Sequence, residues 1–209
     1  MRQRALIAAT AVCLCALGWA DSAKHRETRS EIRDFAPGGR LELHLRGGDV
    51  HIAPGDDQHI RLHYTTESSS ADFAGKVKTE LAMSGQTMKL DVKAPHGGSV
   101  NLEVEVPAHT DLYIRMLGGD LEVGPVKGNQ DLQTHFGDIR VTLPPRTEYG
   151  TVDASTHAGD VNAPEGRPHG FIGSSVTFQG KGKYHIHTHT GAGDILFDTS
   201  DEPGQGLTY

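Results

Sequence analysis

A chain of 209 residues, 36% of them hydrophobic, is long enough for one ordinary domain or two small ones with a modest core. Its 26 glycines and its low aromatic content of 6% argue against a helical bundle and favour many short strands joined by turns. The formal net charge is −7 and no basic stripe is visible, so a nucleic acid is not an expected partner.

The first 20 residues have the three parts of a secretory signal peptide. A basic start, MRQR, precedes an apolar run from Ala5 to about Leu17, and the small-residue sequence GWA ends at Ala20. A retained membrane anchor would need roughly 20 apolar residues, and this run is shorter. We therefore expect export with cleavage after Ala20 and no transmembrane domain in the mature chain; retention of the segment is the alternative.

Cleavage of this segment would change the net charge of the chain and remove its thiol groups. The net charge would become −9, because two arginines are removed, and both cysteines, Cys13 and Cys15, would go with them. A mature chain without thiols has no disulfide, no thiolate metal site and no cysteine nucleophile. Such acidity favours solubility.

Residues 21–36 are mostly charged and carry no sustained apolar period, which predicts a mobile polar leader whose Ile32 and Phe35 could dock on the first strands. Residues 37–107 form the expected N-terminal antiparallel β-portion, because apolar side chains alternate with polar ones, as in RLELHL and VNLEVEV. Residues 70–84 fit either a short helix or a strand, and the alternation from Val77 to Met83 favours a strand.

Residues 108–200 consist of shorter strands interrupted by Gly-Asp corners. The phrase THFGDIRV at 134–141 returns as THAGDVNA at 156–163 and, with two residues inserted, as THTGAGDILF at 188–197. Units of about 20 residues with a strand, a corner and a strand are typical of a β-solenoid. We predict an all-β fold in which a short right-handed β-solenoid continues the N-terminal portion, with residues 201–209 as a tail; a β-sandwich with similar turns is the alternative. The expected inward columns contain Leu121, Val123, Ile139, Val141, Val161, Ile195 and Phe197.

The Gly-Asp phrase has a structural interpretation that needs no chemistry. Glycine supplies backbone angles that other residues avoid, and aspartate can accept hydrogen bonds from turn amides. We assign this structural corner role to Asp49, Asp120, Asp138, Asp160 and Asp194.

The histidines offer a competing interpretation. His135, His157 and His189 would stack in one outward column beside Thr134, Thr156 and Thr188, and imidazoles in such a column can converge on zinc, nickel or copper. His185 and His187 would share a face with His189, although alternate residues on a strand are about 6–7 Å apart, which is far for chelation. No cofactor is otherwise expected, and a solvated polar face is the simpler interpretation.

Enzymatic function is the third hypothesis. Polysaccharide-cleaving solenoids place paired carboxylates on a stacked face, and Asp138 with Asp160 would be spaced for this. Such enzymes have more coils and long groove-building loops than this chain offers. No nucleophile elbow, phosphate-binding loop or H-E-x-x-H motif occurs, and the calcium-binding G-G-x-G-x-D repeat is matched only loosely. We expect no enzyme.

Several phrases in fixed order carry a family resemblance. FAPGGRLELHLRGGDVHI, VNLEVEVPAHTDLYIRMLGGDLEVGPVKG and then THFGDIRV, THAGDVNA and GAGDILF together resemble a bacterial family of presumed adhesins, a domain of unknown function with a β-solenoid. The resemblance covers about residues 36–198. It implies an exported β-protein of the envelope and brings no catalytic residues. This sequence has histidines before Gly-Asp, where members of that family usually have small polar residues.

These observations combine into one functional prediction. We expect a non-enzymatic adhesin-like or scaffold β-protein, exported to the periplasm, the cell surface or the medium, that engages an envelope polymer or protein through an extended polar face. The unpaired strand edges at the ends of a solenoid also allow an oligomer.

Overall fold

The computed structural model describes residues 25–70, 72–170 and 173–200. The expected signal peptide, Cys13, Cys15 and the tail 201–209 lie outside this range. The prediction of an all-β fold is confirmed: the described chain forms strands apart from a single helical turn, α1 (Phe73–Lys76). That turn precedes strand β5, so residues 70–84 contain both structures that their sequence allowed.

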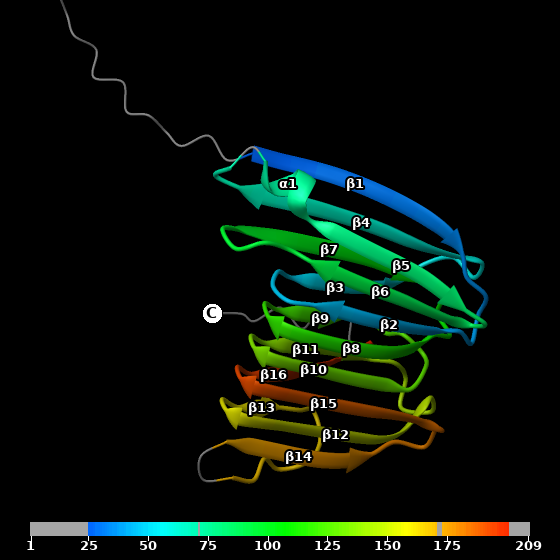
Figure 1. Ribbon diagram of the computed structural model, residues 1–209. Helices are drawn as coiled ribbons and strands as arrows, with labels where there is room; N and C mark the ends of the chain where they lie inside the picture. Colours follow the sequence, from blue (N-terminus) through cyan, green and yellow to red (C-terminus); the bar gives the residue numbers. More distant parts are fainter. Residues whose placement is uncertain (1–24, 71, 171–172, 201–209) are drawn as a thin grey trace, which may run out of the picture.

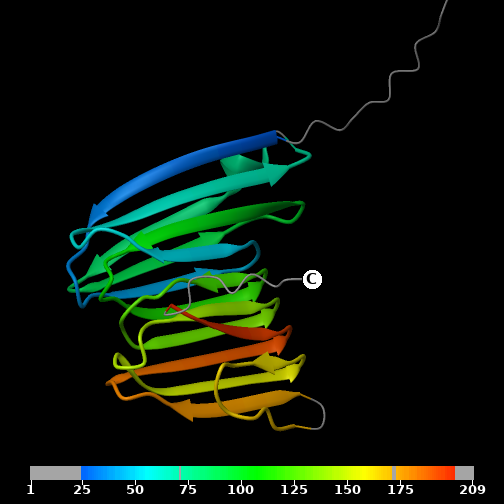
Figure 2. The ribbon, with the colours of Figure 1, turned by 180° about the vertical axis from the view of Figure 1, so that it is seen from behind.

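The strands form two mixed sheets that face each other in one long stack (Figures 1 and 2). In spatial order the first sheet contains β1 (His25–Asp34), β4 (His59–Ser68), β7 (Gly98–Val106), β3 (Val50–Pro54), β9 (Leu121–Val123), β11 (Ile139–Leu143), β16 (Ile195–Thr199) and β13 (Val161–Asn162). The second sheet contains β14 (Ser174–Gln179), β12 (Tyr149–Ala158), β15 (Tyr184–Ala192), β10 (Gln130–Phe136), β8 (Asp111–Gly118), β2 (Arg40–Leu45), β6 (Thr87–Lys93) and β5 (Lys78–Ser84).

The core lies between the two sheets and follows the alternation of the sequence. In β2 the side chains of Leu41, Leu43 and Leu45 are buried, whereas the residues between them are partly exposed. The predicted inward columns are confirmed, because every member is buried: Leu121, Val123, Ile139, Val141, Val161, Ile195 and Phe197. A period of two therefore gives each strand one dry face and one wet face.

The chain crosses repeatedly from the second sheet to the first. Each of β2, β8, β10, β12 and β15 ends at a Gly-Asp corner, after which the next strand enters the first sheet. Neighbouring units pair in parallel and in register, for example Leu132 with Ile114 and Val141 with Val123. Such a two-strand unit buries its inner face only when it is stacked on the next one.

The units are not stacked in chain order. Strand β15 lies between β10 and β12, and β16 lies between β11 and β13. The unit β15–β16, which is the last in the sequence, therefore lies between the units β10–β11 and β12–β13 in space. The interval of 34 positions from Asp160 to Asp194 contains β14, which pairs antiparallel with β12 at the end of the stack and reverses the chain.

Two expectations for the N-terminal half need correction. Residues 25–34 of the predicted mobile leader form β1, which pairs with β4 over ten residues. Phe35 is buried as expected, but Ile32 is 58% exposed. Residues 37–107 are antiparallel only in part: β4 with β7 and β5 with β6 are antiparallel, whereas β2 with β6 and β3 with β7 are parallel.

The corner glycines allow the units to stack closely. Gly137 has a φ of +125°, and a Cβ atom placed there would lie 2.2 Å from the carbonyl oxygen of Gly119 in the next unit. Its N–H donates to the carbonyl of Ala192 at 2.9 Å. A side chain at this position would therefore strain the backbone and separate neighbouring corners.

We expect Gly137→Ala to lower the free energy of unfolding by about 1–3 kcal/mol from backbone strain alone, with the contact to Gly119 adding to the loss. Gly47→Ala is the matched control, because a Cβ atom there meets nothing within 4 Å. Urea denaturation of the two variants measures the difference, and equal stabilities would contradict the proposed role of the corner.

Candidate functional site

The five corner aspartates form one column that runs across the first sheet, where β3, β9, β11, β16 and β13 begin. Four hydrogen bonds join neighbours in this column, each from a backbone N–H to an Oδ1 atom: Asp120 to Asp49 at 3.0 Å, Asp138 to Asp120 at 2.9 Å, Asp194 to Asp138 at 2.8 Å and Asp160 to Asp194 at 2.8 Å. The carboxylates thus join neighbouring units, rather than bonding amides of their own turn. All five residues are exposed.

A groove of about 640 Å³ runs beside this column on the outer face of the first sheet. Six neighbouring strands line it: β7, β3, β9, β11, β16 and β13. Their outward row is Glu103, His51, Glu122, Arg140, Leu196 and Asn162, and the five corner aspartates, each directly before one of the last five strands, complete the lining. We name it the corner groove. Among the described residues it is strongly acidic, since seven carboxylates and a single arginine line it.

Three of the side chains in the groove are held by two ion pairs. His51 Nδ1 lies 3.4 Å from Glu122 Oε2, and Arg140 Nε lies 3.8 Å from Asp198 Oδ2. Both pairs are about half exposed, so they orient the side chains and add little to stability. Glu103 has no ion pair among the described residues, which leaves its carboxylate open to a ligand.

The histidines do not form the single column that was expected. Thr190, and not Thr188, pairs with Thr134 and Thr156, so the repeat aligns without an insertion. Gly191 therefore occupies the position between His135 and His157. His189 directly precedes Thr190, and its position in the repeat is that of Gln133 and Ser155, with which it pairs.

The remaining two histidines belong to other rows of the second sheet. His187 pairs with Asp131 and Asp153, and His185 pairs with Thr151. Within the described part of the chain no group of three or more histidine, cysteine, aspartate or glutamate residues is arranged to hold a metal ion. The hypothesis of zinc, nickel or copper binding thus has no ligand set among these residues.

His157 and His189 come closest to each other. Their ring centroids are 4.9 Å apart with an interplanar angle of 86°, and Ser155 Oγ lies 2.9 Å from His189 Nδ1. Partial burial lowers the pKa of His189 below its ordinary value, and the positive charge that His157 can carry lowers this pKa further. The pair therefore favours the neutral ring of His189.

The threonines of the repeat point inward. Thr134, Thr156 and Thr190 are buried. Their hydroxyl groups donate to corner carbonyls, at 3.2 Å for Phe136, 2.9 Å for Gly193 and 3.0 Å for Gly137, respectively. The expected place of the threonines on the outer face beside the histidines is therefore wrong; Thr134 has the same parity as the buried Leu132, and this alternation is the signal in the sequence that points inward.

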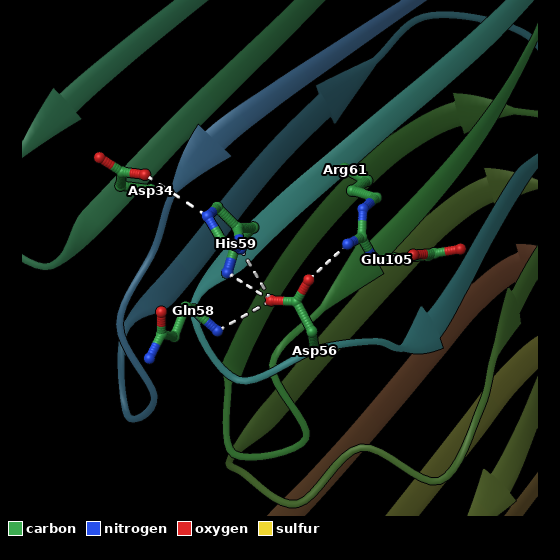
Figure 3. A network of polar contacts seen from close by, with 6 residues as sticks. All are labelled: Asp34, Asp56, Gln58, His59, Arg61 and Glu105. Carbon is green, nitrogen blue, oxygen red and sulfur yellow. Dashed lines mark hydrogen bonds and ion pairs between the residues drawn. The ribbon is translucent and has the colours of Figure 1, made fainter.

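A polar network stabilises the connection from β3 to β4, at the opposite end of the strands from the corners (Figure 3). Asp56 accepts hydrogen bonds from the backbone N–H groups of Gln58 and His59. Arg61 forms ion pairs with Asp56 and, at 2.9 Å, with Glu105. The hydrogen bond from the Gln58 amide is the largest cause that lowers the pKa of Asp56 to about 2. This arrangement fixes a loop and contains no unpaired nucleophile.

The carboxylates considered for glycan cleavage are not neighbours. Asp194 lies between Asp138 and Asp160 in the column, so two strand spacings, roughly 9–10 Å, separate their backbones. Asp138 also uses its Oδ1 atom to accept the Asp194 N–H. The adjacent pair assumed from the sequence does not exist, because the last unit is inserted into the stack.

A solved crystal structure has a similar fold. A presumed cell adhesion protein from Clostridium sporogenes is similar over 83% of this chain and 100% of that chain, with a TM-score of 0.54 and 14% sequence identity. A presumed lipid binding protein from Parabacteroides distasonis covers 82% of this chain and 73% of its own at 12% identity, with a TM-score of 0.32. At these identities the first similarity describes the fold alone.

No protein-family model matches the sequence, and a search of curated proteins finds no match. No helix in the described ranges is long and apolar enough to cross a membrane.

We expect Asp138→Ala to lower the free energy of unfolding by about 1 kcal/mol, because the N–H of Asp194 loses its acceptor. Asp138→Asn keeps an acceptor oxygen and should lose clearly less. Denaturation curves of both variants distinguish the hydrogen bond from the charge; if asparagine and alanine destabilise equally, the carboxylate ladder does not act through this bond.

The depressed pKa of His189 predicts acid sensitivity. The unfolded chain, with a histidine pKa of about 6.5, binds the proton more readily than the folded chain, so the contribution of His189 to stability is complete above that value and is lost as the pH falls toward the lower folded pKa. His189→Gln should reduce the loss of stability between pH 8 and about pH 5. His157→Gln should reduce it partly, by removing the neighbouring ring. Identical pH dependence in all three proteins would refute this effect.

Proposed function

We propose that the protein is an exported, non-enzymatic binding protein of the cell envelope that engages an elongated polar ligand along the corner groove. The observation that carries this proposal is the course of the groove, which crosses six neighbouring parallel strands and carries a corner aspartate at five of them. Parallel neighbours are about 4.8 Å apart. A ligand with its own repeat, such as a glycan chain, can therefore make similar contacts at successive strands.

The charge of the groove selects the chemistry of the ligand. Seven carboxylates and one arginine favour groups that donate hydrogen bonds or carry positive charge. A hydroxyl-rich or amine-bearing envelope glycan meets this requirement, whereas an acidic polymer would be repelled.

The finer description of the fold belongs to the same proposal. We interpret the stacked two-strand units as a short right-handed β-solenoid that belongs to the family of presumed adhesins, with antiparallel pairs β1–β4 and β5–β6 at one end and β12–β14 at the other. The in-register parallel pairing supports this interpretation. Cell adhesion, the role named for the similar Clostridium sporogenes protein, agrees with a binding function here.

Export rests on the N-terminal sequence. Residues 1–20 have the charge, apolar length and small-residue ending of a signal peptide, and an envelope glycan is accessible only to an exported protein. We therefore place the protein in the periplasm, on the cell surface or in the medium.

Glycan binding tests the proposal directly. We expect the purified protein to bind neutral or amine-bearing polysaccharides and not acidic ones, as measured by a glycan array and isothermal titration. Glu103→Gln combined with Glu122→Gln should weaken binding by about tenfold or more, since a hydrogen bond to a charged group contributes about 1.5–3 kcal/mol. Glu80→Gln, which removes a carboxylate from β5 in the other sheet, is the matched control.

Two outcomes would oppose this function. Absence of binding to every glycan class, or equal affinity in the groove variant and the control, removes the corner groove as the binding site. Release of shortened glycan products that stops in Asp138→Asn or Asp160→Asn would instead establish an enzyme.

A further inference from the structure

Strand β1 forms one edge of the first sheet and is available for pairing. Its ten residues, HRETRSEIRD, pair with β4 on one side, and no strand of the described chain lies on the other side. Figure 1 shows β1 along one end of the stack. An edge of this length presents a row of N–H and C=O groups that can accept another strand.

The charges of β1 are arranged symmetrically with opposite sign about Ser30. If two copies of β1 run antiparallel with Ser30 opposite Ser30, each charged residue from position 26 to position 34 lies opposite a residue of the other sign. The three facing pairs are Arg26 with Asp34, Glu27 with Arg33 and Arg29 with Glu31, and each occurs twice. The remaining facing residues, Thr28 and Ile32, are uncharged.

Neighbouring registers lack this complementarity. Moving the centre to Arg29 places Arg29 opposite itself and Glu27 opposite Glu31. Moving it to Glu31 places Glu31 opposite itself and Arg29 opposite Arg33. Like charges directly opposite each other destabilise a strand pair, so the sequence favours a single register.

Two ion pairs within β1 already hold four of these charged side chains along the strand. Arg29 and Glu27 form an ion pair of 2.7 Å along the strand, and Arg33 and Glu31 form one of 3.0 Å. Both pairs lie on the same face of β1, because the four residues have the same parity. In the antiparallel arrangement the two ion pairs of one copy would face those of the other and merge into one alternating network.

The uncharged positions support the same register. Ile32 is 58% exposed on the outer face, where it would contact Thr28 of the second copy. A β-branched pair of this kind contributes to strand association. Charges that merely protect an edge from aggregation need no such symmetry, because any distribution of charge would serve that purpose.

We propose that two copies of the protein associate through β1, antiparallel and centred on Ser30, and so join their first sheets into one continuous sheet. The two-fold axis is perpendicular to the sheet, because the faces of both strands must match. Both corner grooves therefore lie on the same side of the dimer.

Sedimentation and reversal of charge test the pairing. The full chain, exported with its own N-terminal segment, should sediment as a dimer. Arg29→Glu should convert it to a monomer, because Glu31 of the other copy then faces a like charge twice in each dimer. Arg29→Glu combined with Glu31→Arg restores opposite charges and should restore the dimer, and circular dichroism checks that each variant is folded.

Disulfide trapping tests the register without relying on charge. In a background with Cys13→Ser and Cys15→Ser, Ser30→Cys should give an oxidised covalent dimer, since directly opposed residues lie within disulfide distance. Thr28→Cys alone should not cross-link, because its own copies are four residues out of register, whereas Thr28→Cys with Ile32→Cys should. A monomeric protein at every concentration, a dimer that Arg29→Glu leaves intact, or cross-linking of Thr28→Cys alone would overturn the proposal.

Discussion

Close backbone packing at the Gly-Asp corner is the constraint on which the rest of the structure depends. The carbonyl of one corner glycine lies where the Cβ atom of the next would be, so only glycine permits this approach. Threonine hydroxyls satisfy the corner carbonyls from inside the stack, and aspartate carboxylates join the amides outside it. With the spacing thus fixed, the apolar columns and the outward rows come into register together.

The same packing explains why a structural repeat also creates a surface. Each corner contributes an aspartate to one column and directs the following strand so that every second side chain faces outward. Repetition gives a long groove with an aspartate at five of its six strands, beside a row of varied side chains. The Oδ1 atoms of the aspartates thus stabilise the stack by accepting hydrogen bonds, and the negative charges of the same side chains make the groove acidic.

Local features were predictable from the sequence, and the arrangement in space was not. Alternation placed Leu121, Ile139 and Ile195 in the core correctly, because a strand with one buried face requires it. The order of the units depends on where β14 reverses the chain, and spacing between aspartates carries no information about that choice. The phrase THTGAGD contains two threonines, and only pairing with Thr134 shows that Thr190 is the equivalent one. Charge alone suggested a mobile leader, but the long partner β4 makes residues 25–34 a strand.

The insertion of the last unit has a consequence for folding. Strands β15 and β16 lie between units that are synthesised earlier, so β10 and β12 gain their shared neighbour only when residues 184–199 are present. In the described chain these two strands are what connects the units on either side of them within both sheets. Pairing between strands that are distant in the sequence requires long loops to close before the contacts form, so this order of units slows folding relative to a stack built in chain order.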